Sequence, residues 1–373
     1  MTSQKRRRRD RPGDQARVLI TGGAGFIGTN LADHLLKRGH KVRILDNLSR
    51  KGVEQNLTWL CAQHERNPPD IRIADIRDVR AVAAAVEGIA QVYHLAAQVA
   101  VTTSIEHPEA DFDTNVRGTL NILEAMRHRR VPPSLVYTST NKVYGNLEDL
   151  ALRRKGTRYE PSDPAVRTWG VDERHNLNFG SPYGCSKGAA DQYVLDYAHT
   201  YGLQTVVFRM SCIYGPHQFG TEDQGWVAHF LIRSVEAVPI TIYGDGLQVR
   251  DVLFIDDLLQ ALTLAQTRIG SLGGRAFNIG GGPAHTLSLV ELLQIIETLS
   301  GQAPEVTYAD WRASDQRYFV ADARAFGSLT GWSPQVDVRT GVRWLYRWLT
   351  EQRFPVSAAV ALNMPSVAER NVP

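Results

Sequence analysis

The stretch Val18–Gly28 reads V-L-I-T-G-G-A-G-F-I-G and decides the fold. A short apolar run ends at Thr21, and glycines follow at Gly22, Gly25 and Gly28 before a segment with apolar residues at helical spacing. This order predicts a strand, a tight turn and a helix. Glycine lets the backbone come close to a ligand, and the free N–H groups at the start of a helix attract phosphate. We interpret the stretch as a dinucleotide-binding turn rather than an ordinary glycine turn, because further elements follow in the right order.

A second strand and an acidic residue support this interpretation. Gly39 ends the predicted helix, Val42–Leu45 form the next strand, and Asp46 follows about twenty residues past the turn, where a carboxylate can bind ribose hydroxyls. A carboxylate there would repel a ribose 2′-phosphate, so Asp46 favours NAD over NADP. Arg50 and Lys51 would favour the phosphate instead, unless they are simply solvated.

The composition excludes several classes of protein. The 373 residues carry a formal net charge of +3, but the run Lys5–Arg9 is entirely basic, so the rest of the chain is slightly acidic. No aromatic residues interleave with these charges, and we expect a disordered, solvated tail over 1–16 rather than a nucleic-acid or membrane site. No apolar run is long enough to span a membrane, and residues 10–16 lack the apolar core of a signal peptide.

The cysteines indicate the compartment. Cys61, Cys185 and Cys212 have no C-x-x-C spacing. An odd number of cysteines without such spacing is typical of a reducing compartment without structural disulfides or zinc. We therefore expect a cytoplasmic protein without a bound metal.

Strands and helices alternate along most of the chain. Beyond Leu45, we expect strands at Ile71–Ile73, Val92–Ala97, Ser134–Thr138, Thr205–Arg209, Val252–Ile255 and Ala276–Gly280. This alternation predicts an α/β fold with a Rossmann-type doubly wound parallel sheet. Ligands in such sheets lie beyond the carboxyl ends of the strands.

The pattern changes towards the end of the chain. Helical spacing from Leu287, a strand near Val306 and a terminal helix through Trp348 predict a smaller lobe that closes over the cofactor. We assign 17–213 and about 238–286 to the NAD-binding domain, and about 214–237 and 287–350 to a discontinuous C-terminal substrate lobe. Residues 355–373 are assigned to a tail.

Strand ends supply further candidates for the cofactor site. Asp75 and Ile76 follow the third strand, where they could hold an adenine ring by its amino group and its face. Asp75 is an equally good N-cap for the helix that begins near Val79. Ala96 and Ala97 are small enough to let a cofactor lie against the backbone.

The sharpest chemical signal is S-P-Y-G-C-S-K, residues Ser181–Lys187. Tyr183 and Lys187 are four residues apart and share one face of the predicted helix. A tyrosine that acts as a base at neutral pH needs its pKa, near 10 in water, lowered by about three units. A nearby ammonium and the positive nicotinamide of NAD⁺ would supply that shift. The pair is common by chance, but behind a nucleotide-binding turn it becomes specific.

These motifs together resemble the extended short-chain dehydrogenase/reductase family, the sugar-nucleotide epimerases and dehydratases. The resemblance covers about Arg17–Leu349 and rests on T-G-G-A-G-F-I-G, H-L-A-A-Q, S-T-N-K-V-Y-G, Y-G-C-S-K and R-D-V-L-F-I-D-D. It implies a triad of Thr140, Tyr183 and Lys187, in which Thr140 binds the substrate oxygen, Tyr183 takes its proton and Lys187 holds the nicotinamide ribose. The cofactor contacts expected from the residues and the resemblance together are Gly22, Gly25, Phe26, Ile27, Asp46, Asn47, Asp75, Ile76, Leu95, Ala96, Ala97, Tyr183, Lys187 and Met210.

The two residues after Thr140 bear on the type of reaction. The family's 4,6-dehydratases carry an Asp-Glu pair there to expel water, whereas this chain has Asn141 and Lys142. The resemblance therefore implies epimerisation, by oxidation and re-reduction of one carbinol. Longer stretches such as H-N-L-N-F-G-S-P-Y-G and S-D-Q-R-Y-F-V-A-D are most similar to the family's CDP-paratose 2-epimerase group, which implies inversion at C2 of a CDP-linked sugar.

A nucleoside diphosphate brings negative charge, so arginines should converge on the mouth of the site. Arg250 and Arg312 match the family's diphosphate-binding arginines, although either alone would more often form a surface salt bridge. The expected substrate contacts are Thr140, Asn141, Asn178, Gln224, Arg250 and Arg312.

Two other functions stay open. One is a UDP-sugar 4-epimerase, because the fold does not fix the substrate. The other is a non-catalytic NAD-binding regulator, which we disfavour because Tyr183 and Lys187 are both present. We expect a homodimer that acts on a nucleoside-diphosphate sugar and has no nucleic-acid or membrane partner.

Overall fold

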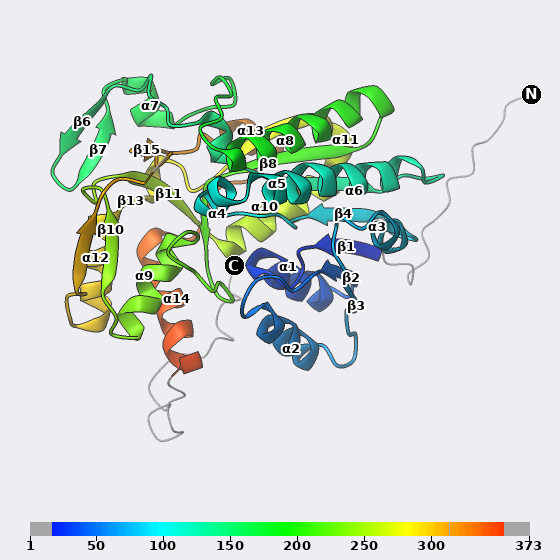
Figure 1. Cartoon of the computed structure of the whole chain (residues 1–373), viewed down its shortest axis with the longest axis horizontal. Helices are drawn as coiled ribbons and strands as arrows, with labels where there is room; N and C mark the ends of the chain where they lie inside the picture. Colours follow the sequence, from blue (N-terminus) through cyan, green and yellow to red (C-terminus); the bar gives the residue numbers. More distant parts are fainter. Residues whose placement is uncertain (1–16, 313, 354–373) are drawn as a thin grey trace, which may run out of the picture.

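The computed structural model describes residues 17–312 and 314–353, so the tails expected over 1–16 and 355–373 lie outside the described residues. A seven-stranded sheet forms the centre, in the order β12-β8-β5-β4-β1-β2-β3, and every neighbouring pair is parallel (Figure 1). Its strands are β1 (Arg17–Thr21), β2 (Lys41–Asp46), β3 (Asp70–Ile73), β4 (Gln91–His94), β5 (Ser134–Thr140), β8 (Thr205–Met210) and β12 (Arg275–Ile279).

Helices cover both faces of this sheet because its central strands are apolar on both sides. Val18 and Ile20 of β1 pack into one hydrophobic cluster and Leu19 into another, and all three are fully buried. The first cluster includes α1 (Phe26–Lys37), α2 (Val53–Gln63), α10 (Ile255–Thr267) and α13 (Arg324–Thr330). The second includes α3 (Val79–Val86), α6 (Gly118–Arg127) and α8 (Pro182–Tyr201). The predicted Rossmann-type, doubly wound parallel sheet is therefore confirmed.

Shorter elements connect these layers. They are α4 (Val101–Glu106), α5 (Pro108–Phe112), the π-helical turn η1 (Asp113–Arg117), the 3₁₀ turn η2 (Asn141–Tyr144), α7 (Pro164–Trp169) and α11 (Ile269–Leu272). The turn η1 leads directly into α6. None of the described helices is both long and apolar enough to cross a membrane.

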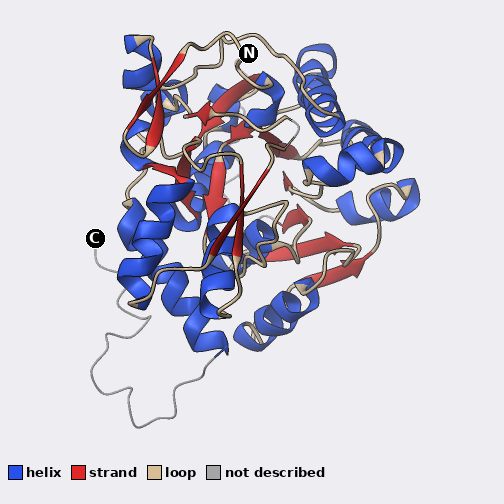
Figure 2. Ribbon diagram, turned by 60° about the vertical axis from the view of Figure 1, so that its left-hand side comes forward, coloured by secondary structure: helices blue, strands red, loops and turns tan. Residues whose placement is uncertain are grey.

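Smaller sheets lie beside the central one (Figure 2). One pairs β10 (Ile240–Tyr243) with β14 (Val306–Ala309), and another joins β9 (Cys212–Tyr214), β11 (Val249–Phe254), β13 (Thr286–Ser288) and β15 (Tyr318–Phe319). The helices of this part are α9 (Trp226–Val235), η3 (Pro283–His285), α12 (Leu289–Ser300) and α14 (Val338–Arg353).

We expected 238–286 to belong entirely to the NAD-binding domain and 287–350 entirely to the substrate lobe. In the structure, each segment contributes to both the central sheet layer and the smaller sheets. Within 238–286, β10 and β11 pair outside the central sheet, whereas β12 is its edge strand. Within 287–350, Phe326 of α13 packs edge-on against Phe208 of β8 and Phe277 of β12, so α13 covers the central sheet. The chain therefore passes between the two parts more often than the hydrophobic pattern indicated.

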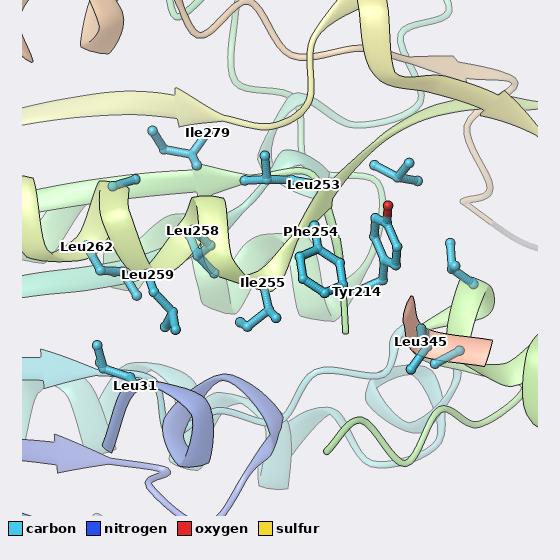
Figure 3. Close-up of a cluster of buried hydrophobic side chains, with 14 of the residues drawn as sticks. Leu31, Tyr214, Leu253, Phe254, Ile255, Leu258, Leu259, Leu262, Ile279 and Leu345 are labelled. Atoms are coloured by element: carbon cyan, nitrogen blue, oxygen red, sulfur yellow. The ribbon is translucent and has the colours of Figure 1, made fainter. Parts of the chain in front are cut away.

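One hydrophobic cluster runs through both parts. Leu31 of α1 and Leu258 of α10 belong to the same cluster as Tyr214, Phe254 and Leu345 from the smaller sheets and α14 (Figure 3). Tyr214 and Phe254 meet edge-on with ring centroids 5.5 Å apart. The two parts thus share a continuous core.

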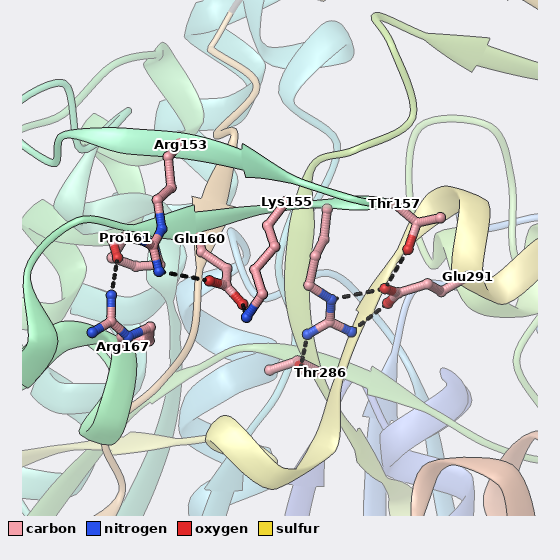
Figure 4. A network of polar contacts seen from close by, with 9 residues as sticks. Arg153, Lys155, Thr157, Glu160, Pro161, Arg167, Thr286 and Glu291 are labelled. Carbon is pink, nitrogen blue, oxygen red and sulfur yellow. Dashed lines mark hydrogen bonds and ion pairs between the residues drawn. The ribbon is translucent and has the colours of Figure 1, made fainter.

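A hairpin that the sequence analysis did not predict, β6 (Leu152–Lys155) and β7 (Arg158–Pro161), is fixed by polar contacts (Figure 4). Arg158 donates to Glu291 Oε1 at 2.7 Å and to Thr286 Oγ1 at 2.9 Å. Glu291 also caps α12, since its carboxylate accepts from the N–H of Ser288 at 2.9 Å. The hairpin is thereby attached to the start of α12.

Candidate active site

A cavity of about 580 Å³ lies beyond the carboxyl ends of the central strands, between the sheet and the smaller part. Its lining comes from segments throughout the chain. The expected site residues that line it are Gly22, Gly25, Phe26, Ile27, Asp46, Asn47, Asp75, Ile76, Leu95, Ala96, Ala97, Thr140, Asn141, Tyr183, Lys187, Met210, Gln224, Arg250 and Arg312.

Asn178 is the expected site residue that the structure does not bring to this cavity. It is exposed in the loop before α8, and its backbone N–H donates to Val143 O at 2.9 Å. Its carbonyl lies close to Gly145. These contacts attach the loop to η2, and the role of Asn178 as a substrate contact stays a prediction.

The glycine turn brings backbone close to backbone. Gly22 has φ +69°, and a Cβ there would lie 2.7 Å from the nitrogen of Ala96. A Cβ on Gly28 would lie 2.3 Å from the carbonyl oxygen of Gly22. Helix α1 starts at Phe26 with Gly25 as N-cap, without a side-chain cap and without an acidic residue in its first turn. The first N–H groups of α1 are therefore available to an anion at the cavity wall, which fits a pyrophosphate.

Asp46 lies beside this turn. Its Oδ2 accepts from the N–H of Ala24 at 3.0 Å and its Oδ1 from that of Leu48 at 2.9 Å. Burial raises the pKa of Asp46, and these N–H groups oppose the rise. Each carboxylate oxygen can accept a further hydrogen bond, so Asp46 fits a pair of ribose hydroxyls.

Asp75 is not the N-cap of the following helix. That position belongs to Asp78, whose side chain accepts from the N–H groups of Arg80 and Ala81. Asp75 instead accepts from Asn47 Nδ2 at 2.8 Å and from Arg77, whose hydrogen bond lowers the pKa of Asp75 to about 2. The capping alternative is thus excluded, and Asp75 faces the cavity.

Apolar surfaces continue the cofactor side of the cavity. Ile76 packs so closely on α6 that a Cβ at Gly118 would lie 2.5 Å from its Cδ1. Leu95, Ala96 and Ala97 follow β4, and Met210 is the last residue of β8. These residues form a wall from the glycine turn to the catalytic helix.

The start of α8 fixes the tyrosine and the lysine. Ser181 is the N-cap and accepts from the N–H of Gly184 at 3.1 Å, and Pro182 occupies the first turn. Tyr183 and Lys187 are both buried. Lys187 Nζ donates to Thr138 O at 2.6 Å and lies 4.3 Å from the ring centroid of Tyr137.

The electrostatics of the pair differ from our expectation. Burial raises the pKa of Tyr183 to about 12, although its hydrogen bond with Thr140 acts in the opposite direction. Burial also lowers the pKa of Lys187 to about 7, against the effect of Asp191 and Asp111. The side chains alone therefore leave Tyr183 protonated at neutral pH, and the lowered tyrosine pKa that we expected is not a property of the chain by itself.

Thr140 ends β5, two residues beyond the strand end that we predicted. Its Oγ1 donates to Asn141 Oδ1 at 3.3 Å and accepts from the N–H of Lys142 at 3.2 Å. Asn141 Nδ2 in turn donates to Gln316 Oε1 at 3.3 Å. A chain of polar groups thus links the hydroxyl of Thr140 to a segment far away in sequence.

Both expected arginines line the cavity, and both are paired with acids. Arg250 donates to Asp315 Oδ1 at 2.8 Å and to Val249 O at 2.9 Å. Arg312 lies within 3.4 Å of Glu222 and 3.5 Å of Asp223, and its guanidinium stands 3.7 Å from the ring centroid of Tyr243. A bound diphosphate would have to compete with these carboxylates.

Further charged residues line the cavity, among them Arg50, Lys142 and Asp315, and sequence reasoning gave none of these three a role in substrate binding. Arg50 donates to Gln224 Oε1 at 2.7 Å and so joins the loop after β2 to the loop before α9. Lys142 and Asp315 also line the cavity. Both stand in motifs that the sequence analysis quoted, S-T-N-K-V-Y-G and S-D-Q-R-Y-F-V-A-D, but their position follows only from the fold.

Comparison with known proteins agrees with this site. Residues 18–280 match the model of the NAD dependent epimerase/dehydratase family. A CDP-paratose 2-epimerase of Salmonella typhi is 45% identical over 89% of this chain and 98% of its own. A putative UDP-glucose 4-epimerase of Methanocaldococcus jannaschii is 31% identical over 89% of this chain and 98% of its own.

The fold agrees as well. The UDP-glucose 4-epimerase of Thermus thermophilus, solved in complex with NAD, superposes with a TM-score of 0.74 at 33% identity, covering 89% of this chain and 98% of that one. The glycine turn, the Asp46 carboxylate and the uncapped start of α1 fit the same cofactor, NAD. The chain therefore belongs to the NAD dependent epimerase/dehydratase family of enzymes.

Proposed function

We propose that this enzyme inverts C2 of a nucleoside-diphosphate sugar, with a CDP-linked dideoxyhexose as its substrate. The observation that carries the proposal is the convergence of Thr140, Tyr183 and Lys187 on the cavity that also contains the glycine turn. Asn141 and Lys142 provide no carboxylate pair beside Thr140, which favours epimerisation over loss of water. The 45% identical relative is named as a CDP-paratose 2-epimerase, which supports C2 and CDP.

In this proposal the chain's own residues orient the sugar and move one proton. Tyr183 Oη would take the proton of the C2 hydroxyl and later return it to the same oxygen. Thr140, which hydrogen-bonds Tyr183, would hold that oxygen, and Lys187 would bind the nicotinamide ribose and favour the ionised tyrosine. When bound, NAD⁺ supplies the hydride acceptor and a positive charge beside the tyrosine.

The remaining roles follow from the placement of each group in the cavity. The first N–H groups of α1 would bind the pyrophosphate, Asp46 the ribose hydroxyls, and Asp75 with Ile76 the adenine. Arg250 and Arg312 would exchange their acidic partners for the substrate diphosphate. Asn141 and Gln224 would contact the sugar or the phosphates.

We propose that the chain forms an NAD-binding unit and a substrate-binding unit, as the sequence predicted. Their boundaries are now assigned from the strand pairing. The NAD-binding unit would contain the seven-stranded sheet, which includes β12, together with α10 and α13. The substrate-binding unit would contain β10, β14, α9 and α12, which line or flank the part of the cavity around Arg312.

Exposed apolar side chains support a homodimer. Ile105 of α4, Phe112 of α5 and Tyr193 of α8 are 49%, 48% and 44% exposed. Both short helices contact α8, so the three residues come from neighbouring helices, and Ile105 also lines the cavity. Light scattering coupled to size-exclusion chromatography should give twice the mass of the chain, and replacing Phe112 and Tyr193 by serine should give the monomer.

The cysteines support a cytoplasmic location. Cys61, Cys185 and Cys212 all lie in the described part of the chain, and all are free. Free thiols persist in a reducing compartment. Fractionation of cells that express the tagged chain would test this location.

Product analysis tests the function. The enzyme should convert CDP-paratose to its C2 epimer, identified by chromatography and NMR. Conversion of UDP-glucose to its C4 epimer, with CDP-paratose unchanged, would favour the activity named for the relatives from M. jannaschii and T. thermophilus. Binding of NAD without turnover of CDP-, UDP-, GDP- or dTDP-sugars would favour a regulator.

A further inference from the structure

Lys142 is a cationic side chain of the cavity to which the mechanism above gives no role. It lies in η2, directly after Asn141, and lines the same cavity as Thr140 and Arg250. Its ammonium donates to the carbonyl oxygen of Ser314 at 3.1 Å. An ammonium has three N–H donors, so this contact leaves capacity for a ligand.

The charge of Lys142 is less compensated than that of its cationic neighbours. Arg250 is paired with Asp315 at 2.8 Å, and Arg312 lies within 4 Å of both Glu222 and Asp223. Within residues 17–312 and 314–353, Lys142 forms no ion pair of this kind. Burial is the main cause that lowers the pKa of Lys142 to about 8, and Arg250 adds to the effect while Asp315 opposes it. A dianionic ligand would therefore meet a cation that has no carboxylate within ion-pair distance in the described part of the chain.

Lys142 has contacts both with Thr140 and with the segment that pairs with Arg250. Its backbone N–H donates to Thr140 Oγ1 at 3.2 Å, so it is adjacent to the residue proposed to hold the reacting oxygen. Its side chain extends to Ser314, next to the Asp315 that pairs with Arg250. Lys142 thus contacts Thr140 through its backbone and, through its ammonium, the residue next to the partner of Arg250.

We propose that the ammonium of Lys142 binds the β-phosphate of the nucleoside-diphosphate sugar and thereby holds C2, rather than C4, against Thr140 and Tyr183. This inference rests on the proposed function. In a sugar nucleotide the β-phosphate is attached through the anomeric oxygen to C1, and C2 is the neighbouring carbon, whereas C4 lies across the ring. A residue close to Thr140 is therefore better placed to contact the β-phosphate when the reacting carbon is C2 than when it is C4.

Binding of CDP and of CMP tests the contact without any turnover, because the two ligands differ only in the β-phosphate. Isothermal titration calorimetry of the NAD-loaded enzyme would compare the wild type with Lys142→Met, Lys142→Arg and the control Lys155→Met. Lys155 is an exposed lysine of β6 paired with Glu160 at 3.0 Å. Lys142→Met should weaken CDP about 10-fold or more and change CMP less than about twofold, since a hydrogen bond to a charged group contributes of this order. Lys142→Arg should recover most of the loss, and Lys155→Met should bind like the wild type.

Two results would overturn the inference. Equal loss of CDP and CMP binding by Lys142→Met would assign the residue to the fold of η2 instead of the β-phosphate. If Lys142→Met bound both CDP and CMP as the wild type does, the proposed contact between Lys142 and the phosphates would be wrong. The product from CDP-paratose and UDP-glucose is determined separately by NMR. Inversion at C4 with the CDP–CMP difference intact would support the phosphate contact and overturn both the proposed function and the selection of C2.

Discussion

The cofactor half and the substrate half of the cavity are built in different ways. The cofactor half, around the glycine turn, contains backbone groups at close approach and the Asp46 carboxylate, which accepts from the N–H groups of Ala24 and Leu48. The substrate half contains cationic side chains that are paired with acids from other segments, such as Arg250 with Asp315 and Arg312 with Glu222. The groups of the first half are held in place by backbone contacts, whereas the arginines of the second half would have to exchange their acidic partners for a bound anion.

The largest effect should come from the group at which the two halves meet. Tyr183→Phe removes the proposed acid and base of both half-reactions, so we expect kcat to fall by 10²- to 10⁴-fold. Bound NAD and the melting temperature should stay close to those of the wild type. Initial rates on CDP-paratose measure the loss, and Tyr201→Phe, at an exposed tyrosine of the same helix, is the matched control. Wild-type activity in Tyr183→Phe would contradict the mechanism.

In the cofactor half, NAD binding should be weakened by a substitution that displaces the backbone of the glycine turn. In Gly28→Ala the new Cβ would lie 2.3 Å from Gly22 O and 2.6 Å from the Cα of Gly23, so the turn or α1 has to move. Overpacking of this kind costs about 1–3 kcal/mol, and we expect NAD to bind about 10- to 100-fold more weakly. Fluorescence titration with NAD measures this affinity. Gly270→Ala, where a Cβ meets nothing within 4 Å, should have no effect; equal losses in both variants would refute the argument.

These two predictions also indicate how much the sequence could provide. Asp46, the glycine turn and the Tyr183–Lys187 pair were found because each depends on spacing within one or two neighbouring elements. Their roles remain predictions until such variants are measured. The central sheet was predicted for the same reason, since its strands are local apolar runs that end in glycine or polar residues.

The rest depends on contacts between distant segments. Asn178 was expected to contact the substrate, but it is not among the residues that line the cavity, and its backbone N–H donates to Val143 of η2. The capping role of Asp75 was excluded only when Asp78 was seen to accept from the first turn of α3. The raised pKa of Tyr183 follows from burial, which no local pattern reports. The partners of Arg312 stand about ninety residues earlier in the chain.

The substrate half should respond in binding rather than in chemistry. Arg312→Ala removes a cation and leaves Glu222 and Asp223 facing the diphosphate without their partner. The diphosphate is bound alike in the ground state and the transition state, so we expect KM to rise about 10-fold with little change in kcat. Steady-state kinetics on CDP-paratose separate the two constants. Arg153→Ala, on the β6–β7 hairpin, should leave both unchanged, whereas a fall in kcat alone for Arg312→Ala would place this arginine at the chemistry.

The last prediction concerns the hydrogen at C2, the carbon that inverts. We expect this hydrogen not to exchange with solvent. C2 can invert by loss and return of hydride, or by loss of a proton to a base and return of another from water. The second route needs a neighbouring carbonyl that makes the C–H acidic and bases on both faces of the ring. Beside Thr140 the chain offers Tyr183 and, at Asn141 and Lys142, no carboxylate pair. In the first route the hydrogen passes between the two halves of the cavity without meeting water, while the 2-keto sugar turns to present its other face.

Turnover in D₂O, followed by NMR of the product, should therefore show no deuterium at C2, and substrate deuterated at C2 should retain its label. Stoichiometric uptake of solvent deuterium at C2 would eliminate the oxidation route, and with it the proton transfer that we assign to Tyr183.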